Sequence, residues 1–286
     1  MNPKIPIAAI TDEFSTDLET ALDAMQEIGM SAAEFRVIWG KNILDLSDGE
    51  LERVREITTS KRFNVISIAS PLLKCVLPNA PPIDSRFQHD VFASKHTFED
   101  QHRLAERAFA IAKKFNAGII RVFSFWRTTE PEKCFDGIVR SLGEIVEMAA
   151  AQSLVVGLEN EHACNIATAR ETARLLEALP HPNLRVVWDP ANAYVAGENP
   201  YPEGYRLLPP HRVVHVHAKD CHLDGHAPVW GPLGTRAVDW KGQIAALLKD
   251  GYAGYLSLET HWQGPGGDKL EASKICGWNL RGLASS

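Results

Sequence analysis

Four short apolar segments in the second half of the chain each end in a side chain that can bind a divalent metal ion. Glu159 ends LVVGLE, Asp189 ends RVVWD, His217 ends VVHVH and Glu259 ends YLSLE. Three carboxylates brought together would repel one another unless a cation or protons neutralised them. Three oxygen ligands with one imidazole favour Mn²⁺ or Mg²⁺, and Co²⁺ or Zn²⁺ also fit such a set.

These segments belong to a repeating pattern that predicts the fold. Short apolar runs rich in Val and Ile alternate with longer amphipathic segments, as buried parallel strands alternate with helices. The eight runs are residues 5–10, 32–38, 65–69, 119–125, 154–158, 184–188, 213–216 and 255–258. The pattern favours a single (β/α)₈ TIM barrel over residues 1–286. An open doubly wound sheet is disfavoured because no GxGxxG or GxxxxGK[ST] motif follows the first run.

Alternation along the strands indicates which side chains point into the barrel. His215, His217 and Lys219 share one face of the seventh run, and Ser257 and Glu259 share one face of the eighth. The opposite faces are apolar and suit contact with helices. Each polar residue taken singly has an ordinary explanation, such as a helix cap or a hydrogen-bonded core histidine. Together they predict convergence at the C-terminal mouth of the barrel.

Local signals predict helix ends and one long connection. Capping boxes are expected at residues 16–19, 47–50 and 168–171, and Gly29 and Gly118 are expected to end helices. The third run is followed by a connection, residues 72–98, that contains three prolines. A connection of this length suits a lid or binding loop over the mouth, and equally a surface excursion or a dimer contact.

Composition excludes several classes of protein. The chain has 286 residues, 45% apolar and 23% charged, with a net charge of −6. This balance is typical of a globular protein, and the acidic charge argues against a nucleic-acid partner. No apolar stretch reaches the ~18 residues of a membrane span. Five cysteines without a CxxC pair, and an N-terminus without a secretory signal, predict a cytoplasmic protein.

Most of the chain resembles a known family, and the resemblance is strongest from Val155 to His261. The stretches that carry the resemblance are LEN (158–160), WDPAN (188–192), HVHAKD (215–220), GPLGTRAVDW (231–240) and GYAGYLSLE (251–259). In this order they resemble the sugar phosphate isomerase/epimerase family of xylose isomerase-like TIM barrels. The resemblance implies one metal ion held by Glu159, Asp189, His217 and Glu259, with Glu159 and Glu259 also acting as acid and base. It implies a small-molecule carbohydrate substrate that is isomerised or epimerised through an enediolate.

Several residues differ from the motifs of particular family members, and these differences narrow the range of expected activities. Asn165, Asn192 and Leu223 replace the glutamate, histidine and arginine of ketohexose epimerases. Endonuclease IV needs three zinc ions and histidines that this sequence lacks, so a nuclease is the least favoured alternative. A lyase or dehydratase acting on a keto-sugar or keto-glycoside would use the same site. A carbohydrate-binding barrel without catalysis is the further alternative.

Other polar residues are candidates for contact with the substrate. Lys219 could hold a substrate oxygen or form an ion pair with Asp220. The side chains of Glu34 and Arg36 are expected to point into the barrel, where they could contact the substrate or form a buried ion pair with each other. The full set of candidates is Lys219, Asn160, Asn192, Glu34, Arg36 and Trp262. Arg236 stands where relatives often have glycine, which favours an unphosphorylated substrate. Family members are often dimers or tetramers, so a homo-oligomer is compatible with the sequence.

Overall fold

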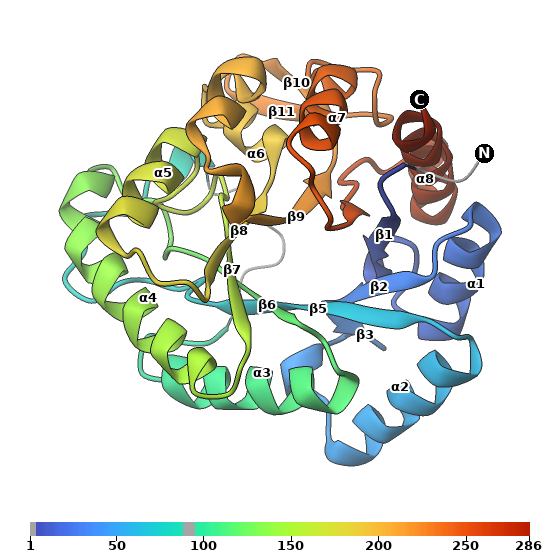
Figure 1. The fold of residues 1–286 in the computed structure, drawn as a ribbon, viewed down its shortest axis with the longest axis horizontal. Coiled ribbons are helices and arrows are strands. Elements are labelled where there is room, and N and C mark those ends of the chain that lie inside the picture. Colours follow the sequence, from blue (N-terminus) through green and yellow to red (C-terminus); the bar gives the residue numbers. More distant parts are fainter. Residues whose placement is uncertain (1–3, 88–94) are drawn as a thin grey trace.

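Eight parallel strands form a closed barrel, as the sequence predicts (Figure 1). The computed structural model describes residues 4–87 and 95–286. The barrel strands are β1 (Ile7–Ile10), β2 (Ala32–Phe35), β5 (Asn64–Leu72), β6 (Ile119–Val122), β7 (Val155–Glu159), β8 (Leu184–Trp188), β9 (Val213–Ala218) and β12 (Leu256–Leu258). The sheet closes because β1 pairs with β12 on one side and with β2 on the other. Each strand overlaps one of the predicted apolar runs.

Helices surround the barrel and cover the outer faces of its strands (Figure 1). They are α1 (Leu18–Ile28), α2 (Asp48–Ser60), α3 (Gln101–Phe115), α4 (Phe135–Ala150), α5 (Ala169–Ala178), α6 (Pro190–Val195), α7 (Trp240–Lys249) and α8 (Lys269–Ser285). Their apolar sides join the outward residues of the strands in one core. Among the helices of the described residues, none is long and apolar enough to cross a membrane.

Two small hairpins extend from the C-terminal ends of barrel strands. The first follows β2 and pairs β3 (Val37–Ile38) with β4 (Lys41–Asn42). The second follows β9 and pairs β10 (Cys221–Asp224) with β11 (Ala227–Trp230). The connection from β5 to α3 contains a short 3₁₀ turn at Ser85–Phe87. The part of the predicted long connection at residues 88–94 lies outside the described residues.

Helix caps follow the predicted signals in part. Capping boxes form at Ser47 and Thr168, each with the expected glutamate, and Gly29 ends α1 with a left-handed backbone. The box predicted at residues 16–19 is wrong. Asp17 caps α1 instead, because its carboxylate accepts the backbone N–H of Thr20 at 2.9 Å. Gly118 is also not a cap, since Asn116 takes the left-handed position after α3.

The interior of the barrel is polar near its mouth, as the strand parity predicts. Glu34 on β2, Ser67 on β5, Arg121 on β6, His215 on β9 and Ser257 on β12 are all 4% exposed or less. Burying charged groups is favourable only when each is paired or hydrogen-bonded. The charged groups among them are paired: Glu34 with His215, and Arg121 with Glu159, one of the predicted metal ligands.

Candidate metal centre and active site

The four predicted metal ligands come together at the mouth of the barrel. Glu159 ends β7, Asp189 follows β8, His217 lies on β9 and Glu259 follows β12. These strands are consecutive neighbours in the barrel, so their C-terminal ends present the four side chains side by side. One ligand atom from each residue lies within 4.8 Å of the others, and all four residues are buried. We call these four residues the ligand cluster.

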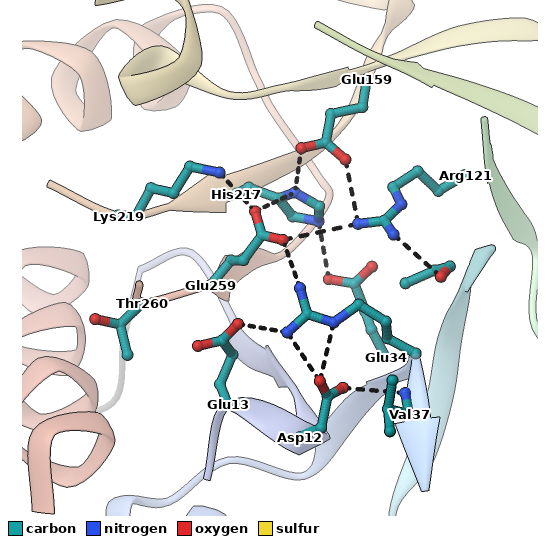
Figure 2. Close-up of polar contacts among 12 residues, drawn as sticks. Asp12, Glu13, Glu34, Val37, Arg121, Glu159, His217, Lys219, Glu259 and Thr260 are labelled. Atoms are coloured by element: carbon teal, nitrogen blue, oxygen red, sulfur yellow. Dashed lines mark hydrogen bonds and ion pairs between the residues drawn. The ribbon is translucent and has the colours of Figure 1, made fainter. Parts of the chain in front are cut away.

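His217 lies between the two glutamates of the ligand cluster (Figure 2). Its Nδ1 is 3.2 Å from Glu159 Oε1 and 3.4 Å from Glu259 Oε2. The same ring nitrogen therefore faces both carboxylates for which the family resemblance implies acid–base roles. A neutral imidazole binds a metal ion through one nitrogen while the other donates a hydrogen bond.

Three buried cations contact the carboxylates of the ligand cluster. Lys219 Nζ lies 2.8 Å from Asp189 Oδ2 and 2.8 Å from Glu259 Oε2. Arg36 Nη1 donates to Glu259 Oε1 at 2.9 Å. Arg121 Nη1 lies 3.2 Å from Glu159 Oε2 (Figure 2). The charges of the three carboxylates are thus offset by side chains of the chain itself.

Lys219 belongs to this network and is not paired with Asp220. The Asp220 carboxylate instead accepts the backbone N–H groups of Gly234, Arg236 and Val238 at 2.9 to 3.1 Å. Asp220 therefore fixes the loop that leads into α7, and it leaves the Lys219 ammonium to the ligand cluster.

The environment shifts the proton affinities within the ligand cluster in opposite directions. Burial raises the pKa of Asp189 to about 6, although Lys219 acts against this shift. Burial also disfavours ionised Glu259, but the charges of Lys219 and His217 outweigh it and hold the pKa of Glu259 well below its usual range. Burial disfavours the charged form of His217, yet Glu159, Glu34 and Glu259 raise its pKa well above the usual value.

The donor set fits a divalent cation. Three carboxylates and one imidazole suit Mn²⁺ or Mg²⁺, and no thiolate of a structural zinc site is among them. Glu159 Oε2 and Asp189 Oδ2 are buried and receive no hydrogen bond among the described residues. Lys219 is close enough to Asp189 Oδ2 for an ion pair, but it does not meet the geometry of a hydrogen bond. Buried carboxylate oxygens of this kind are suited to bind a metal ion.

Two asparagines predicted as substrate contacts hold the ligands in place. The Asn160 side chain accepts the backbone N–H of Asp189 at 2.8 Å and donates to the Asp189 carbonyl at 2.8 Å. The Asn192 side chain donates to Glu159 Oε1 at 3.3 Å and lies 2.9 Å from His162 Nδ1. Both amides are engaged by the protein and contact residues of the ligand cluster.

Glu34 contacts two histidines of β9 and is not among the residues that line the cavity described below. Its Oε1 is 2.7 Å from His215 Nε2 and 3.3 Å from His217 Nε2. A carboxylate behind a histidine ligand fixes the orientation of the ring and directs the opposite nitrogen to the metal. This placement differs from the substrate contact expected from the sequence, since Glu34 does not line the cavity.

Arg36 connects Glu259 at the mouth of the barrel with the 3₁₀ turn Thr11–Glu13 that follows β1. Besides Glu259, its guanidinium contacts Asp12 Oδ2 at 2.9 Å and Glu13 Oε1 at 2.6 Å. Arg36 also lines the cavity, as expected of a residue near the substrate. Trp262, the remaining candidate, is half-buried and packs against the hydrophobic core. It is not among the residues that line this cavity.

A cavity of about 440 Å³ opens beside Glu259. Its walls include Arg36, Arg121 and Phe123, and a further group that sequence reasoning did not assign to the site: Lys41, Lys74, Lys95, His96 and Glu161. The signal that could have found Arg121 is its position as a charged residue inside the apolar run 119–125. Lys74 carried no comparable signal, because it lies within the long connection after the third strand.

Comparisons with known proteins agree with the fold. The family model described as xylose isomerase-like TIM barrel matches residues 22–277, and the chain therefore belongs to this family. No curated protein matches the sequence significantly.

Solved structures with the same fold have different described roles. The IOLI protein with a bound zinc atom has a TM-score of 0.74 and 16% identity, covering 98% of both chains. The D-allulose 3-epimerase from Methylomonas sp. in complex with D-allulose has a TM-score of 0.70 and 14% identity, covering 99% of this chain and 97% of its own. The probable 3-DHS dehydratase AsbF from Bacillus anthracis has a TM-score of 0.70 and 19% identity, covering 96% and 98%. Such low identities show the fold alone.

Proposed function

We propose that this protein is an enzyme that uses one divalent metal ion to move a proton next to a carbonyl group of a carbohydrate, as an isomerase or an epimerase. The observation that carries the proposal is the ligand cluster, whose four ligand atoms lie within 4.8 Å of one another at the mouth of the barrel. When bound, the ion would polarise the carbonyl oxygen and offset the negative charge left by removal of the proton. The zinc atom of the IOLI structure supports a divalent ion in this fold, and the donor chemistry favours Mn²⁺ or Mg²⁺.

Glu159 and Glu259 are the residues we assign to proton transfer. They come from β7 and from the segment after β12, and two strands separate these positions in the barrel. Carboxylates on opposite sides of a carbon can remove a proton from one face and return it to the other, which is epimerisation. One carboxylate acting alone can move the proton between neighbouring carbons, which is isomerisation.

Neighbouring cations contact both carboxylates. Arg36 and Lys219 both contact Glu259 and keep it ionised, so it can accept a proton. Arg121 lies 3.2 Å from Glu159 and 3.8 Å from Glu259, so it can also donate N–H groups to substrate oxygens between them. The cavity beside Glu259 has a volume of about 440 Å³, which is suited to a small molecule.

Exchange of substrate hydrogen with solvent tests the proposal. The manganese-loaded protein is incubated in deuterium oxide with a panel of ketoses, keto acids and keto-glycosides, and deuterium in the substrate is followed by NMR. We expect exchange next to the carbonyl with the wild type, and none with Glu159→Gln or Glu259→Gln. Glu198→Gln is the control, because this carboxylate caps α5 away from the ligand cluster and should leave exchange intact. Exchange at the wild-type rate in both cluster variants would refute the assignment.

Elimination by the same residues is the second candidate function. The AsbF structure, described as a probable dehydratase, supports it because that protein has the same fold. After proton removal, a hydroxyl or glycosyl group on the next carbon can leave before the proton is returned. Product analysis separates the two reactions, since an isomer has the mass of its substrate and an eliminated product does not. A barrel that binds carbohydrate without catalysis would show neither exchange nor product.

A further inference from the structure

We propose that His162 is a positioning residue for Glu159. Its Nδ1–H group holds the amide of Asn192 in the orientation that donates a hydrogen bond to the Glu159 carboxylate. This inference rests on the proposed function, because Glu159 is assigned there to metal binding and proton transfer. His162 lies shortly after the end of β7 and is not among the residues that line the cavity. It therefore acts through Asn192 and not by contact with the substrate.

Two acceptors decide which way the Asn192 amide points. One end of this amide lies 3.3 Å from Glu159 Oε1 and 3.0 Å from the backbone carbonyl oxygen of Asn160. A carbonyl oxygen and an ionised carboxylate can only accept hydrogen bonds, so the end of the amide that faces them has to be the donor, Nδ2. The amide oxygen, Oδ1, then faces His162 Nδ1 at 2.9 Å.

The Nδ1 atom of His162 faces a second acceptor as well. Glu161 Oε1 lies 2.8 Å from it, and this oxygen also accepts the backbone N–H of Ala163 at 3.2 Å. A ring nitrogen that faces a carboxylate oxygen and an amide oxygen is satisfied only when it carries hydrogen. His162 Nδ1 is therefore a donor shared between Glu161 and Asn192, in the neutral and in the charged ring alike.

Burial makes the direction of the amide important. Glu161 and His162 are each 6% exposed, and Asn192 and Glu159 are 0% exposed. A hydrogen bond that is lost at such a position is costly, because water does not easily replace it. Without the His162 donor, Asn192 Oδ1 loses the hydrogen bond it receives on that side, and the amide could tilt away from Glu159.

Asn192 contacts two members of the ligand cluster. Its backbone N–H donates to Asp189 Oδ1 at 2.8 Å, and its side chain donates to Glu159 Oε1, which also lies 3.2 Å from His217 Nδ1. Contacts on Oε1 from two sides fix the plane of the Glu159 carboxylate and so the direction of Oε2. Groups behind a metal ligand that orient it in this way typically change metal affinity or activity about 10- to 100-fold when they are removed.

The protonation of His162 in the metal-free protein is the first test, because it needs neither metal nor substrate. Protein labelled with ¹⁵N in histidine is studied by long-range ¹H–¹⁵N NMR at neutral pH. The signals of His162 are assigned from their loss in His162→Asn. We expect Nδ1 to carry hydrogen. A ring that carries hydrogen on Nε2 alone would overturn the inference.

Three substitutions separate a donor at Nδ1 from a general effect of the ring. His162→Asn places an amide N–H where Nδ1 stands, His162→Gln places one near Nε2, and His162→Phe keeps a ring without a donor. In calorimetric titrations with MnCl₂, we expect His162→Phe and His162→Gln to bind the ion about 10- to 100-fold more weakly than the wild type. We expect His162→Asn to bind it with nearly the wild-type affinity. The same affinity in all three variants, whether lowered or not, overturns the inference.

His181→Phe is the matched control. The Nδ1 atom of His181 accepts the backbone N–H of Asn183 at 3.1 Å in the segment before β8, at the opposite end of the barrel strands from His162. This variant should keep the wild-type affinity for manganese, and a loss as large as that of His162→Phe would overturn the inference.

Solvent exchange in deuterium oxide separates this inference from the proposed function. The exchange rates of the three His162 variants should follow the order of their manganese affinities. If no substrate exchanges with the wild type, the proposed function fails, while the NMR result and the order of manganese affinities still decide the role of His162. Wild-type protein that binds no manganese would overturn both.

Discussion

The ammonium group of Lys219 lies 2.8 Å from Asp189 Oδ2, so a lysine contacts two of the four predicted metal ligands, the other being Glu259. A metal ion bound by the ligand cluster would share these oxygens with Lys219. In the metal-free protein, Lys219 offsets the charge of Asp189 and, together with Arg36, that of Glu259. The loss of stability caused by replacing Lys219 should therefore be larger when no metal ion is bound than when one is bound.

Lys219→Met should destabilise the metal-free protein much more than the metal-loaded one. Removing one partner of a buried ion pair typically costs about 3–5 kcal/mol, and a bound cation would offset most of this loss. Urea unfolding with EDTA and with MnCl₂ measures the difference. Lys41→Met serves as the control, because its side chain is 52% exposed. The same loss of stability with and without metal would contradict the account.

Arg36→Met should lower the free energy of unfolding by about 3–5 kcal/mol, because it leaves three buried carboxylates with one cation fewer. These carboxylates belong to Asp12, Glu13 and Glu259. The control is Arg55→Met, which removes an exposed ion pair on α2 and should leave the denaturation midpoint unchanged. Matching midpoints for the two variants would show that the Arg36 network does not stabilise the fold.

Metal binding should release protons, and more of them at low pH. The metal binds neutral imidazole, and the raised pKa of His217 keeps that ring charged at neutral pH in the metal-free protein. At pH 7 we therefore expect about one proton per metal ion. Asp189, with its pKa raised to about 6, adds a second contribution as the pH falls below 6. The metal affinity should accordingly weaken with falling pH.

Calorimetry in buffers with different ionisation enthalpies measures this release. Titrations with MnCl₂ at pH 7.5 and pH 5.5 give the number of protons at each pH. An affinity that is independent of pH, with no proton exchanged, would mean that His217 and Asp189 are not ligands.

Gly157→Ala should weaken both the fold and metal binding. Gly157 lies two residues before Glu159 on β7, and an added Cβ would lie 2.7 Å from Val187 Cγ2 and 3.0 Å from Ile119 Cγ2. Relieving such overlap typically costs about 1–3 kcal/mol and would displace the strand that carries Glu159. Gly49→Ala on α2 is the control, since its Cβ would meet nothing within 4 Å. Equal stability and equal metal affinity in the two variants would contradict the prediction that close packing at Gly157 positions Glu159.

The sequence predicts the barrel because its strands are buried on both faces and therefore appear as continuous apolar runs. It predicts the ligand cluster because strand ends converge in any such barrel. A cap prediction succeeds at Ser47, whose side chain accepts the backbone N–H of Glu50 although Asp48 follows it directly. It fails at residues 16–19, where the carboxylate of Asp17 caps α1 one position further on, so the two similar local sequences do not distinguish the outcomes.

The sequence does not reveal which side chains contact each other when they come from segments far apart in the chain. Asn160 hydrogen-bonds the backbone of Asp189 because β7 and β8 pair in one particular register. Arg121 reaches Glu159 and Glu259 because β6, β7 and β12 surround one interior. Neither relationship follows from local spacing, so the sequence could suggest that these residues face inward but could not identify their partners.

The central claim is that the four side chains of the ligand cluster hold one divalent ion. Diffraction from crystals grown with MnCl₂, recorded at a wavelength where manganese scatters anomalously, tests this most directly. The account predicts one strong anomalous peak per chain, within bonding distance of Glu159, Asp189, His217 and Glu259. No peak among these residues, or a peak elsewhere in the barrel, would contradict it.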